Sequence, residues 1–245
     1  MVTISIVSHG HNHLLPKLVQ TLAETPSVEK ILLTFNIPGK DFEFENGTDD
    51  KISIINNKDP KGFGSNHNQA FTYCKTEFFC ILNPDVEFDA DPFPVLLRCL
   101  NSEYSIVSPV ILNANGDVED HARKFPTLIG LVLKLLRIDY GTYIHGKSLR
   151  TYSPDWIAGM FMLLKSDSYR EVGGFDERYF LYYEDVDICL RFRRIGKKVR
   201  VCDKTSVTHK AHRDSHKKFK FFILHIKSLI VYFSRNPLHL IKRKF

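Results

Sequence analysis

The sequence predicts an α/β fold in which helices flank a central, mostly parallel sheet. Short apolar, β-branched runs occur at residues 2–7, 30–35, 52–55 and 78–82, and each has the length of a buried strand. Segments with helical spacing separate these runs, and strands that alternate with helices indicate parallel pairing through crossovers. With 245 residues and 43% hydrophobic content, the chain has enough apolar side chains for one compact domain.

The first three strands each lead into a polar segment. The first strand ends at Ser8, and leucines then recur at helical spacing over residues 14–22. The second strand ends at Asn36, before a polar, turn-rich segment at residues 38–50. A helix is expected after the third strand, with Ser65 as its N-cap.

Polar residues gather at the carboxyl ends of the predicted strands. The third strand exits through the loop at residues 56–64, and the fourth stops at Asn83-Pro84-Asp85 because proline ends ladder pairing. Ligands of parallel sheets bind outside the carboxyl ends of the strands. We therefore expect Ser8, Asn36, the 56–64 loop and Asp85 to share one crevice.

The middle of the chain is less regular. A helix is expected over residues 87–104, after Asp89 and Asp91, and a strand over residues 106–112 that ends in an Asn-Ala-Asn-Gly turn. Within residues 120–150, an amphipathic helix follows Pro126, and a Gly/Tyr/His/Lys-rich segment after it is expected to be a mobile loop.

Further strands and a helix follow. Residues 156–164 have strand character, and Gly159 permits a close backbone approach there. A helix is expected around residues 166–171, and short strands at 199–202 and 206–208.

Residues 173–194, GGFDERYFLYYEDVDICLRFRR, set carboxylates among aromatic side chains. The five acids are Asp176, Glu177, Glu184, Asp185 and Asp187. An apolar wall raises the pKa of a carboxylate and makes it a better base. An alternative is a Gly-Gly turn and a helix whose acids pair with the arginines that follow them, Arg191, Arg193 and Arg194.

The C-terminal segment is basic and amphipathic. Six apolar residues are expected on one helical face, namely Phe219, Phe222, Ile223, Ile226, Ile230 and Phe233. Residues 191–245 contain 17 Lys and Arg against two acids, a charge of +15 that leaves −9 for residues 1–190. The helix either docks on the core or lies on an anionic membrane, and charge alone also permits nucleic acid or a phosphorylated substrate.

Targeting and cysteine patterns indicate a cytosolic protein. The N-terminal MVTISIVSHG lacks a basic n-region and a long apolar segment, and the longest apolar patch, residues 128–138, is too short to span a bilayer. The five cysteines contain no CxxC pair and are expected to be reduced thiols. No nucleic-acid reading motif is recognisable, so no nucleic-acid partner is expected.

Several motifs occur in an order typical of one enzyme family. They are IVSHGH at the N-terminus, GFGSNHN, LNPD, W-x-A-G-x-F-M-L from Trp156, GGFDE, YYEDVDICLR and the late His209-x-x-His212. With these motifs the chain resembles inverting glycosyltransferases of family 2, which have the GT-A fold, and it looks most like rhamnosyltransferases of bacterial O-antigen and polysaccharide assembly. The match covers residues 2 to about 215, which implies a catalytic domain at 1–215 and a C-terminal helical tail at 216–245.

The resemblance implies a donor site on one side of the crevice. The implied donor-binding residues are Ser8, Asn36, Lys58, Gly62, Asn66, Asn83 and Asp85. Asp85 and His209 would hold Mg²⁺ or Mn²⁺ against the diphosphate, since hard cations prefer oxygen ligands. The first acid of the usual Asp-x-Asp motif is replaced by Asn83, and the acid often found after the second strand is replaced by Phe35-Asn36. The alternative for His209 is a surface histidine at a strand end.

Inverting transfer needs one base at the acceptor hydroxyl and a stabilised departing phosphate. Asp185 matches the family's base, and an ionised Glu184 beside it would raise its proton affinity. Arg191, Lys210 or Arg213 are candidates to assist the leaving group.

The acceptor side is expected to contain Trp156, Gly159 and Asp176. Trp156 either stacks on a sugar face or belongs to the core, and Asp176 is the second candidate for the base. His9, His11 and His13 are not expected to form a metal cluster, because their spacing falls in a loop-to-helix transition.

The resemblance implies transfer of L-rhamnose from dTDP-L-rhamnose to a polyprenyl-diphosphate-linked saccharide at the inner face of a bacterial membrane. The basic tail suits such an acceptor. The alternatives are transfer of another hexose, such as galactose or N-acetylglucosamine, and a non-catalytic nucleotide-sugar-binding module.

Overall fold

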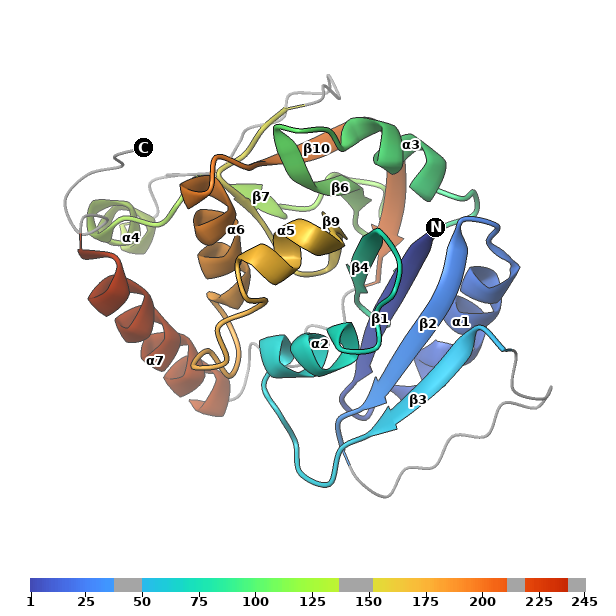
Figure 1. Cartoon of the computed structure of the whole chain (residues 1–245). Helices are drawn as coiled ribbons and strands as arrows, with labels where there is room; N and C mark the ends of the chain where they lie inside the picture. Colours follow the sequence, from blue (N-terminus) through green and yellow to red (C-terminus); the bar gives the residue numbers. More distant parts are fainter. Residues whose placement is uncertain (38–49, 137–151, 211–218, 238–245) are drawn as a thin grey trace.

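The computed structural model describes residues 1–37, 50–136, 152–210 and 219–237. The elements, in chain order (Figure 1), are β1 (Val2–Ser8), a 3-10 helix η1 (Asn12–Leu14), α1 (Leu15–Glu24), β2 (Val28–Phe35), β3 (Ile52–Asn56), α2 (Phe63–Phe71), β4 (Phe78–Leu82), β5 (Val86–Glu87), α3 (Phe93–Cys99), β6 (Tyr104–Leu112), β7 (Ala122–Arg123), α4 (Leu128–Leu135), β8 (Trp156–Ile157), β9 (Phe161–Lys165), α5 (Ser166–Glu171), α6 (Glu184–Arg194), β10 (Lys198–His209) and α7 (Phe219–Arg235).

Within the described residues, the main sheet has eight strands in the order β3-β2-β1-β4-β9-β6-β10-β5. The pairs β1 with β2, β1 with β4, β2 with β3 and β6 with β10 are parallel. Strand β9 runs antiparallel to β4 and β6, and β5 runs antiparallel to β10. The mixed, mostly parallel α/β fold predicted from the sequence is therefore confirmed.

Alternating side chains of the strands point to opposite faces of the sheet and form two hydrophobic cores. On one face, Ile4, Leu33 and Leu163 pack with the apolar residues of α1 and α3. On the other face, Leu32 and Leu164 pack with residues of α2, α5, α6 and α7. Figure 1 shows the helices distributed over both faces of the sheet in this way. This period of two is what strands buried on both faces require.

The helix expected over residues 87–104 is wrong in its extent. The residues Val86–Glu87 form β5 because they pair with Thr208 and His209 of β10, a partner far away in sequence. Helix α3 begins only at Phe93, whose backbone N–H donates to Asp91 Oδ1 at 2.9 Å, and it ends at Cys99.

Three further boundaries differ from expectation. Helix α2 begins at Phe63 with Gly62 as its N-cap, and Ser65 instead donates a hydrogen bond to Glu177 Oε2 at 2.9 Å. Residues 156–164 form two strands in different sheets, β8 paired with β7 and β9 in the main sheet. The strands expected at 199–202 and 206–208 are one strand, β10, with a register shift between Cys202 and Ser206.

Helix α7 uses one side to join the protein core. Ser228, Tyr232 and Phe233 are buried, and Ser228 Oγ donates to the backbone oxygen of Leu181 at 2.8 Å. The apolar residues Phe219, Phe222, Ile223, Ile226 and Ile230 remain exposed. The expected apolar face is therefore mostly on the solvent side, and the docked face is a different one.

No helix within the described ranges is long and apolar enough to cross a membrane. The expected mobile loop after α4, the turn-rich segment before residue 50, His212, Arg213 and the domain boundary after residue 215 lie outside the described residues.

Candidate functional site

Three asparagines form a hydrogen-bonded network that joins the carboxyl ends of β2 and β3 to the first turn of α2. Asn57 Nδ2 donates to Asn36 Oδ1 at 2.9 Å and to Asn66 Oδ1 at 2.6 Å. The Asn36 side chain also donates to the backbone oxygen of Lys61 and accepts from the backbone N–H of Lys61. Asn66 donates to the backbone oxygen of Gly62 at 2.9 Å. Because all three side chains are buried, this asparagine network fixes the loop that leads into α2.

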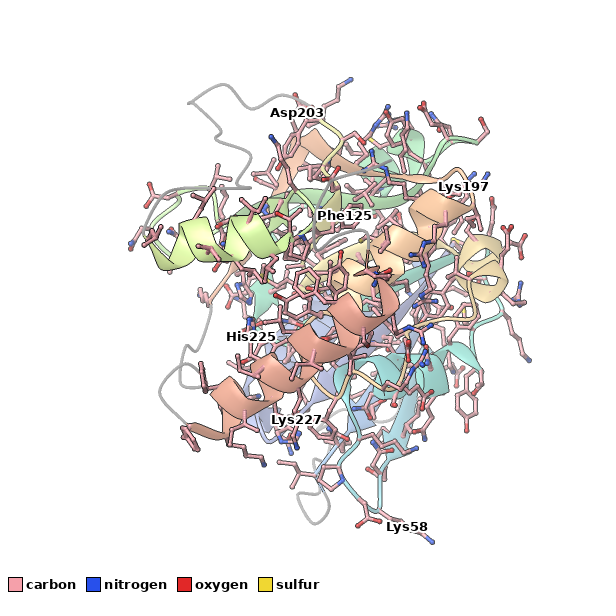
Figure 2. The ribbon with its side chains drawn as sticks, turned by 90° about the vertical axis from the view of Figure 1, so that its left-hand side faces the viewer. Lys58, Phe125, Lys197, Asp203, His225 and Lys227 are labelled. Atoms are coloured by element: carbon pink, nitrogen blue, oxygen red, sulfur yellow. The ribbon has the colours of Figure 1, made fainter. Side chains whose placement is uncertain are left out.

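The other predicted donor residues lie at or after the carboxyl ends of β1, β3 and β4. Ser8 Oγ donates to Asn12 Oδ1 at 2.7 Å, and the Lys58 side chain is exposed at the tip of the loop (Figure 2). A Cβ on Gly62 would lie 2.7 Å from the backbone oxygen of Phe180, so only glycine fits there. The backbone N–H of Asn83 donates to Met160 at 2.9 Å.

His209 lies between two carboxylates. Its Nε2 atom is 3.2 Å from Asp85 Oδ1, and its Nδ1 atom is 2.7 Å from Glu119 Oε2. Burial by itself would lower the pKa of His209, but the two carboxylates outweigh burial and raise that pKa above its ordinary value. The structure thus brings Asp85 and His209 together as expected, and it adds Glu119, which sequence reasoning missed.

Asp85 and His209 suit a hard divalent cation. These two side chains would hold the cation through Asp85 Oδ1 and His209 Nε2, which lie 3.2 Å apart, once Nε2 has lost the proton that the raised pKa of His209 favours. Glu119 would then orient the histidine through its other nitrogen, as outer-shell carboxylates commonly do. Among the described residues, no group of three or more His, Cys, Asp or Glu side chains is arranged to hold a metal.

The acidic stretch enters α6 through two strained residues. Tyr182 and Tyr183 have φ values of 71° and 67°, a left-handed conformation that costs a non-glycine residue about 1–2 kcal/mol. The rings of both tyrosines contact His225 of α7, with centroids 5.2 and 5.3 Å away. This turn places Glu184 and Asp185 in the first turn of α6.

Asp185 has the protonation behaviour of a base. Burial raises its pKa from 3.8 to about 6, although the backbone N–H groups of Val186 and Gly159 partly offset this by bonding the carboxylate. The Val186 N–H donates to Oδ1 at 2.8 Å. A carboxylate with this pKa is ionised at neutral pH and accepts a proton more readily than an ordinary aspartate.

Glu184 is in a more apolar place than Asp185. Its Oε2 atom is buried with no hydrogen-bond partner among the described residues. Burial, and next the charge of Asp185, raise the pKa of Glu184 well above its ordinary value. Burial therefore favours the neutral form of Glu184, which is opposite to the ionised Glu184 that would raise the proton affinity of Asp185 by its charge.

The acid pair opens into a cavity of about 210 Å³. Its lining consists of Arg123, Lys124, Phe125, Pro126, Thr127, Gly130, Leu131, Trp156, Tyr182, Tyr183, Glu184, Asp185, Val186 and His225. Trp156 is half-buried, and its Nε1 donates to the backbone oxygen of Lys124 at 2.9 Å, so its ring is held at the cavity wall. Gly159 packs closely on Phe63, since an added Cβ would lie 2.8 Å from that ring.

Three other residues predicted to take part in binding or catalysis form ion pairs outside the cavity. Asp176 does not line the cavity, and its carboxylate takes two hydrogen bonds from the Arg178 guanidinium, at 2.8 and 2.6 Å. Arg191 pairs with Asp187 at 2.7 Å, which confirms the helix-pairing interpretation for these two residues. Lys210 pairs with Glu87 at 2.9 Å.

Asn57, Glu119 and His225 are the site residues that the sequence did not reveal. Asn57 lies in the loop already assigned to the donor site, so its position was the available signal. Glu119 and His225 reach their partners, His209 and the two tyrosines, across 90 and more than 40 residues, and no local pattern encodes such contacts.

Comparison with known proteins is consistent with this geometry. The profile described as "Glycosyl transferase family 2" matches residues 41–173. The chain is 31% identical over 251 residues to "Rhamnosyltransferase WbbL" of Escherichia coli K12, a match that covers 96% of this chain and 93% of the relative. It is 29% identical to the "N-acetylglucosaminyl-diphospho-decaprenol L-rhamnosyltransferase" of Mycobacterium tuberculosis over 64% of this chain and 54% of the relative.

Solved structures share the fold. GalNAc-T7 with UDP, GalNAc and Mn²⁺ superposes with a TM-score of 0.66 at 14% identity, covering 86% of this chain and 44% of that one. The mannosyltransferase PcManGT of Pyrobaculum calidifontis, in complex with GDP-Man and Mn²⁺, gives a TM-score of 0.61 at 13% identity, covering 99% and 65%. With the family profile and the E. coli relative, these findings show that the chain belongs to glycosyltransferase family 2 and has the GT-A fold.

Proposed function

We propose that this glycosyltransferase transfers L-rhamnose from dTDP-L-rhamnose to a polyprenyl-diphosphate-linked saccharide, with inversion at the anomeric carbon. The observation that carries the catalytic part is Asp185, a carboxylate with a pKa of about 6 on the wall of the cavity. The similarity to two rhamnosyltransferases supports the sugar, and the name of the mycobacterial relative supports a lipid-diphosphate acceptor.

Asp185 acts as the base in this proposal. Its carboxylate takes the proton of the acceptor hydroxyl while the hydroxyl oxygen bonds to the anomeric carbon, and the bond from that carbon to the diphosphate breaks on the opposite face. The backbone N–H groups of Val186 and Gly159 keep the carboxylate in place. Trp156 offers a ring at the cavity wall for the acceptor sugar.

Asp85 and His209 serve the departing diphosphate. A divalent cation held by these two residues would supply positive charge to the leaving group. Glu119 orients the His209 ring through its hydrogen bond to Nδ1. The asparagine network fixes the conformation of the loop before α2, which contacts the nucleotide in this proposal. Asp176 and Gly159 remain proposed neighbours of the acceptor.

The C-terminal part serves the acceptor. We assign residues 1–215, together with the docked side of α7, to the catalytic unit, and the basic charge of the C-terminal segment to binding at the cytoplasmic surface of the inner membrane, where a polyprenyl diphosphate is anchored. The charge of the segment, with eight Lys and Arg and no acid in residues 216–245, supports this assignment.

The test is a donor panel. The protein is incubated with dTDP-rhamnose, UDP-galactose and UDP-N-acetylglucosamine, each with a polyprenyl-diphosphate-linked N-acetylglucosamine, and nucleotide release is followed with Mg²⁺, Mn²⁺ or a chelator. We expect nucleotide release chiefly from dTDP-rhamnose, and we expect the chelator to abolish this release. NMR of the product should show an inverted anomeric centre. Release chiefly from a UDP-sugar would replace rhamnose with another hexose, and no release from any donor would favour a binding module.

A further inference from the structure

Helices α4 and α7 leave apolar side chains uncovered by the protein. Nine large apolar residues on or next to the two helices are between 36% and 77% exposed, namely Leu128, Ile129, Val132, Leu136, Phe219, Phe222, Ile223, Ile226 and Ile230. We call these nine residues the helix-pair surface. Exposed apolar groups in this number on two neighbouring elements are typical of an interaction site.

The helix-pair surface occupies one side of the molecule. In Figure 1 both helices lie on the left, and Figure 2, which views that side, shows α4 and α7 crossing the face toward the viewer. Gly130 and Leu131 of α4 and His225 of α7 also line the cavity that contains Asp185. The exposed apolar residues therefore lie on the same two helices that wall the cavity.

The charge around the helix-pair surface favours an anionic bilayer over a second copy of the chain. Lys220 and Lys227 of α7 lie among its apolar residues, and Lys124, exposed just before α4, lines the cavity. Because residues 216–245 contain eight basic residues and no acid, a second copy of the chain would bring like charges together. An anionic bilayer instead neutralises these cations and accepts the apolar side chains at the boundary between headgroups and acyl chains.

We infer that α4 and α7 together dock the protein flat on an anionic bilayer, with the cavity opening at the headgroup level. The inference goes beyond a membrane-binding tail because it includes α4, and because it aims the cavity of Asp185 at the membrane. Its consequence for the acceptor rests on the proposed function. The docking itself does not, since it depends only on the helix-pair surface.

The test is flotation with vesicles of phosphatidylglycerol and phosphatidylethanolamine, compared with vesicles of phosphatidylcholine alone. Two double variants remove apolar groups that the fold does not bury: Ile129→Ser with Val132→Ser in α4, and Phe222→Ser with Ile230→Ser in α7. Ile54→Ser is the matched control, since Ile54 is 42% exposed on the edge strand β3, at the opposite side of Figure 1. Circular dichroism and thermal melting verify that each variant folds.

We expect each double variant to lower partitioning into anionic vesicles by about tenfold or more, while Ile54→Ser matches the unchanged protein. Unchanged binding of the α4 variant would overturn the two-helix surface, and equal binding to phosphatidylcholine would overturn its anionic preference. A dimer in light scattering that both double variants abolish would assign the surface to a second copy.

Different results would contradict the proposed sugar transfer and the proposed membrane docking. Vesicle binding without sugar transfer from any donor would remove the proposed function and leave the docking surface. Transfer to a short-chain, water-soluble acceptor that all variants retain, without vesicle binding by the unchanged protein, would remove the docking surface and leave the proposed function.

Discussion

The asparagine network and the acid pair, which we propose as the donor and acceptor sides of the active site, differ in the backbone that carries them. On the proposed donor side, Asn36, Asn57 and Asn66 bond to one another and to the backbone, and Asn57 Oδ1 is buried without a hydrogen-bond partner among the described residues. On the acceptor side, Glu184 has an oxygen without a partner among the described residues, and the turn before it contains two left-handed tyrosines. Buried polar groups are normally bonded, and strain persists where the surroundings enforce it, often at functional sites. Among the described residues both proposed sides thus contain a buried oxygen without a partner, and the left-handed, non-glycine backbone is found at the acid pair.

Replacing Asp185 by Asn should have the largest effect on catalysis and almost none on donor binding. The amide keeps the shape but cannot take a proton, so kcat is expected to fall by about 10³-fold, within the range of general bases. The donor Kd should stay within about twofold by calorimetry, and the melting temperature should not fall, because a charge that burial disfavours is gone. A variant that keeps more than a tenth of the activity would remove Asp185 as the base.

The pH profile should locate the same group. Because the pKa of Asp185 is about 6, kcat/KM should drop about tenfold per unit below pH 6 and level off above it. The raised pKa also means that the contribution of Asp185 to stability is present below about pH 4 and is lost as the pH rises to about 6. Donor Kd values across the same range are the control for His209. A flat profile from pH 5 to 7 would contradict the assignment.

Asn57→Ala should act on the donor side through stability. It leaves the buried Asn66 Oδ1 without its donor, at a cost of about 1–3 kcal/mol in the free energy of unfolding, whereas Asn36 Oδ1 still accepts from the backbone N–H of Lys61. Urea titration followed by the fluorescence of Trp156, the single tryptophan, measures this cost. The control is the exposed Asn101→Ala, which should cost less. Equal costs for both variants would mean that the network adds no stability.

Glu184→Gln should have the smallest effect. Burial and the charge of Asp185 favour the neutral form of Glu184, so a neutral amide of the same shape should hold kcat within about threefold. Steady-state kinetics beside Asp185→Asn provide the comparison. If Glu184→Gln loses as much activity as Asp185→Asn, the base would be Glu184 and the division between the two acids would be wrong.

Local patterns predicted the sheet and most helices well. The apolar runs at β1, β2 and β4 are buried strands and the run at β3 is an edge strand with Ile54 exposed, and polar residues follow their carboxyl ends. Local patterns failed where a distant partner decides. Val86 forms a strand because it pairs with β10. Residues 156–164 form two strands because Trp156 and Ile157 pair with Ala122 and Arg123 in a separate sheet.

The candidate site follows the same rule. Asp185, Asp85 and His209 were found from their motifs, and the last two do meet. The left-handed conformation of Tyr182 and Tyr183 could not be predicted, because nothing in a tyrosine favours positive φ. It depends on contacts with α7, more than 40 residues later in the chain.

That dependence sets how short an active fragment can be. His225, Ser228 and Tyr232 hold the strained turn, and Asn236 accepts a hydrogen bond from Arg194 of α6 at 2.7 Å. Without α7, relaxation of the two tyrosines would release their strain and turn Glu184 and Asp185 away from the cavity. A chain that lacks α7 is therefore expected to lose its activity although no reacting atom lies in that helix, and a fragment that retains activity must extend through Asn236.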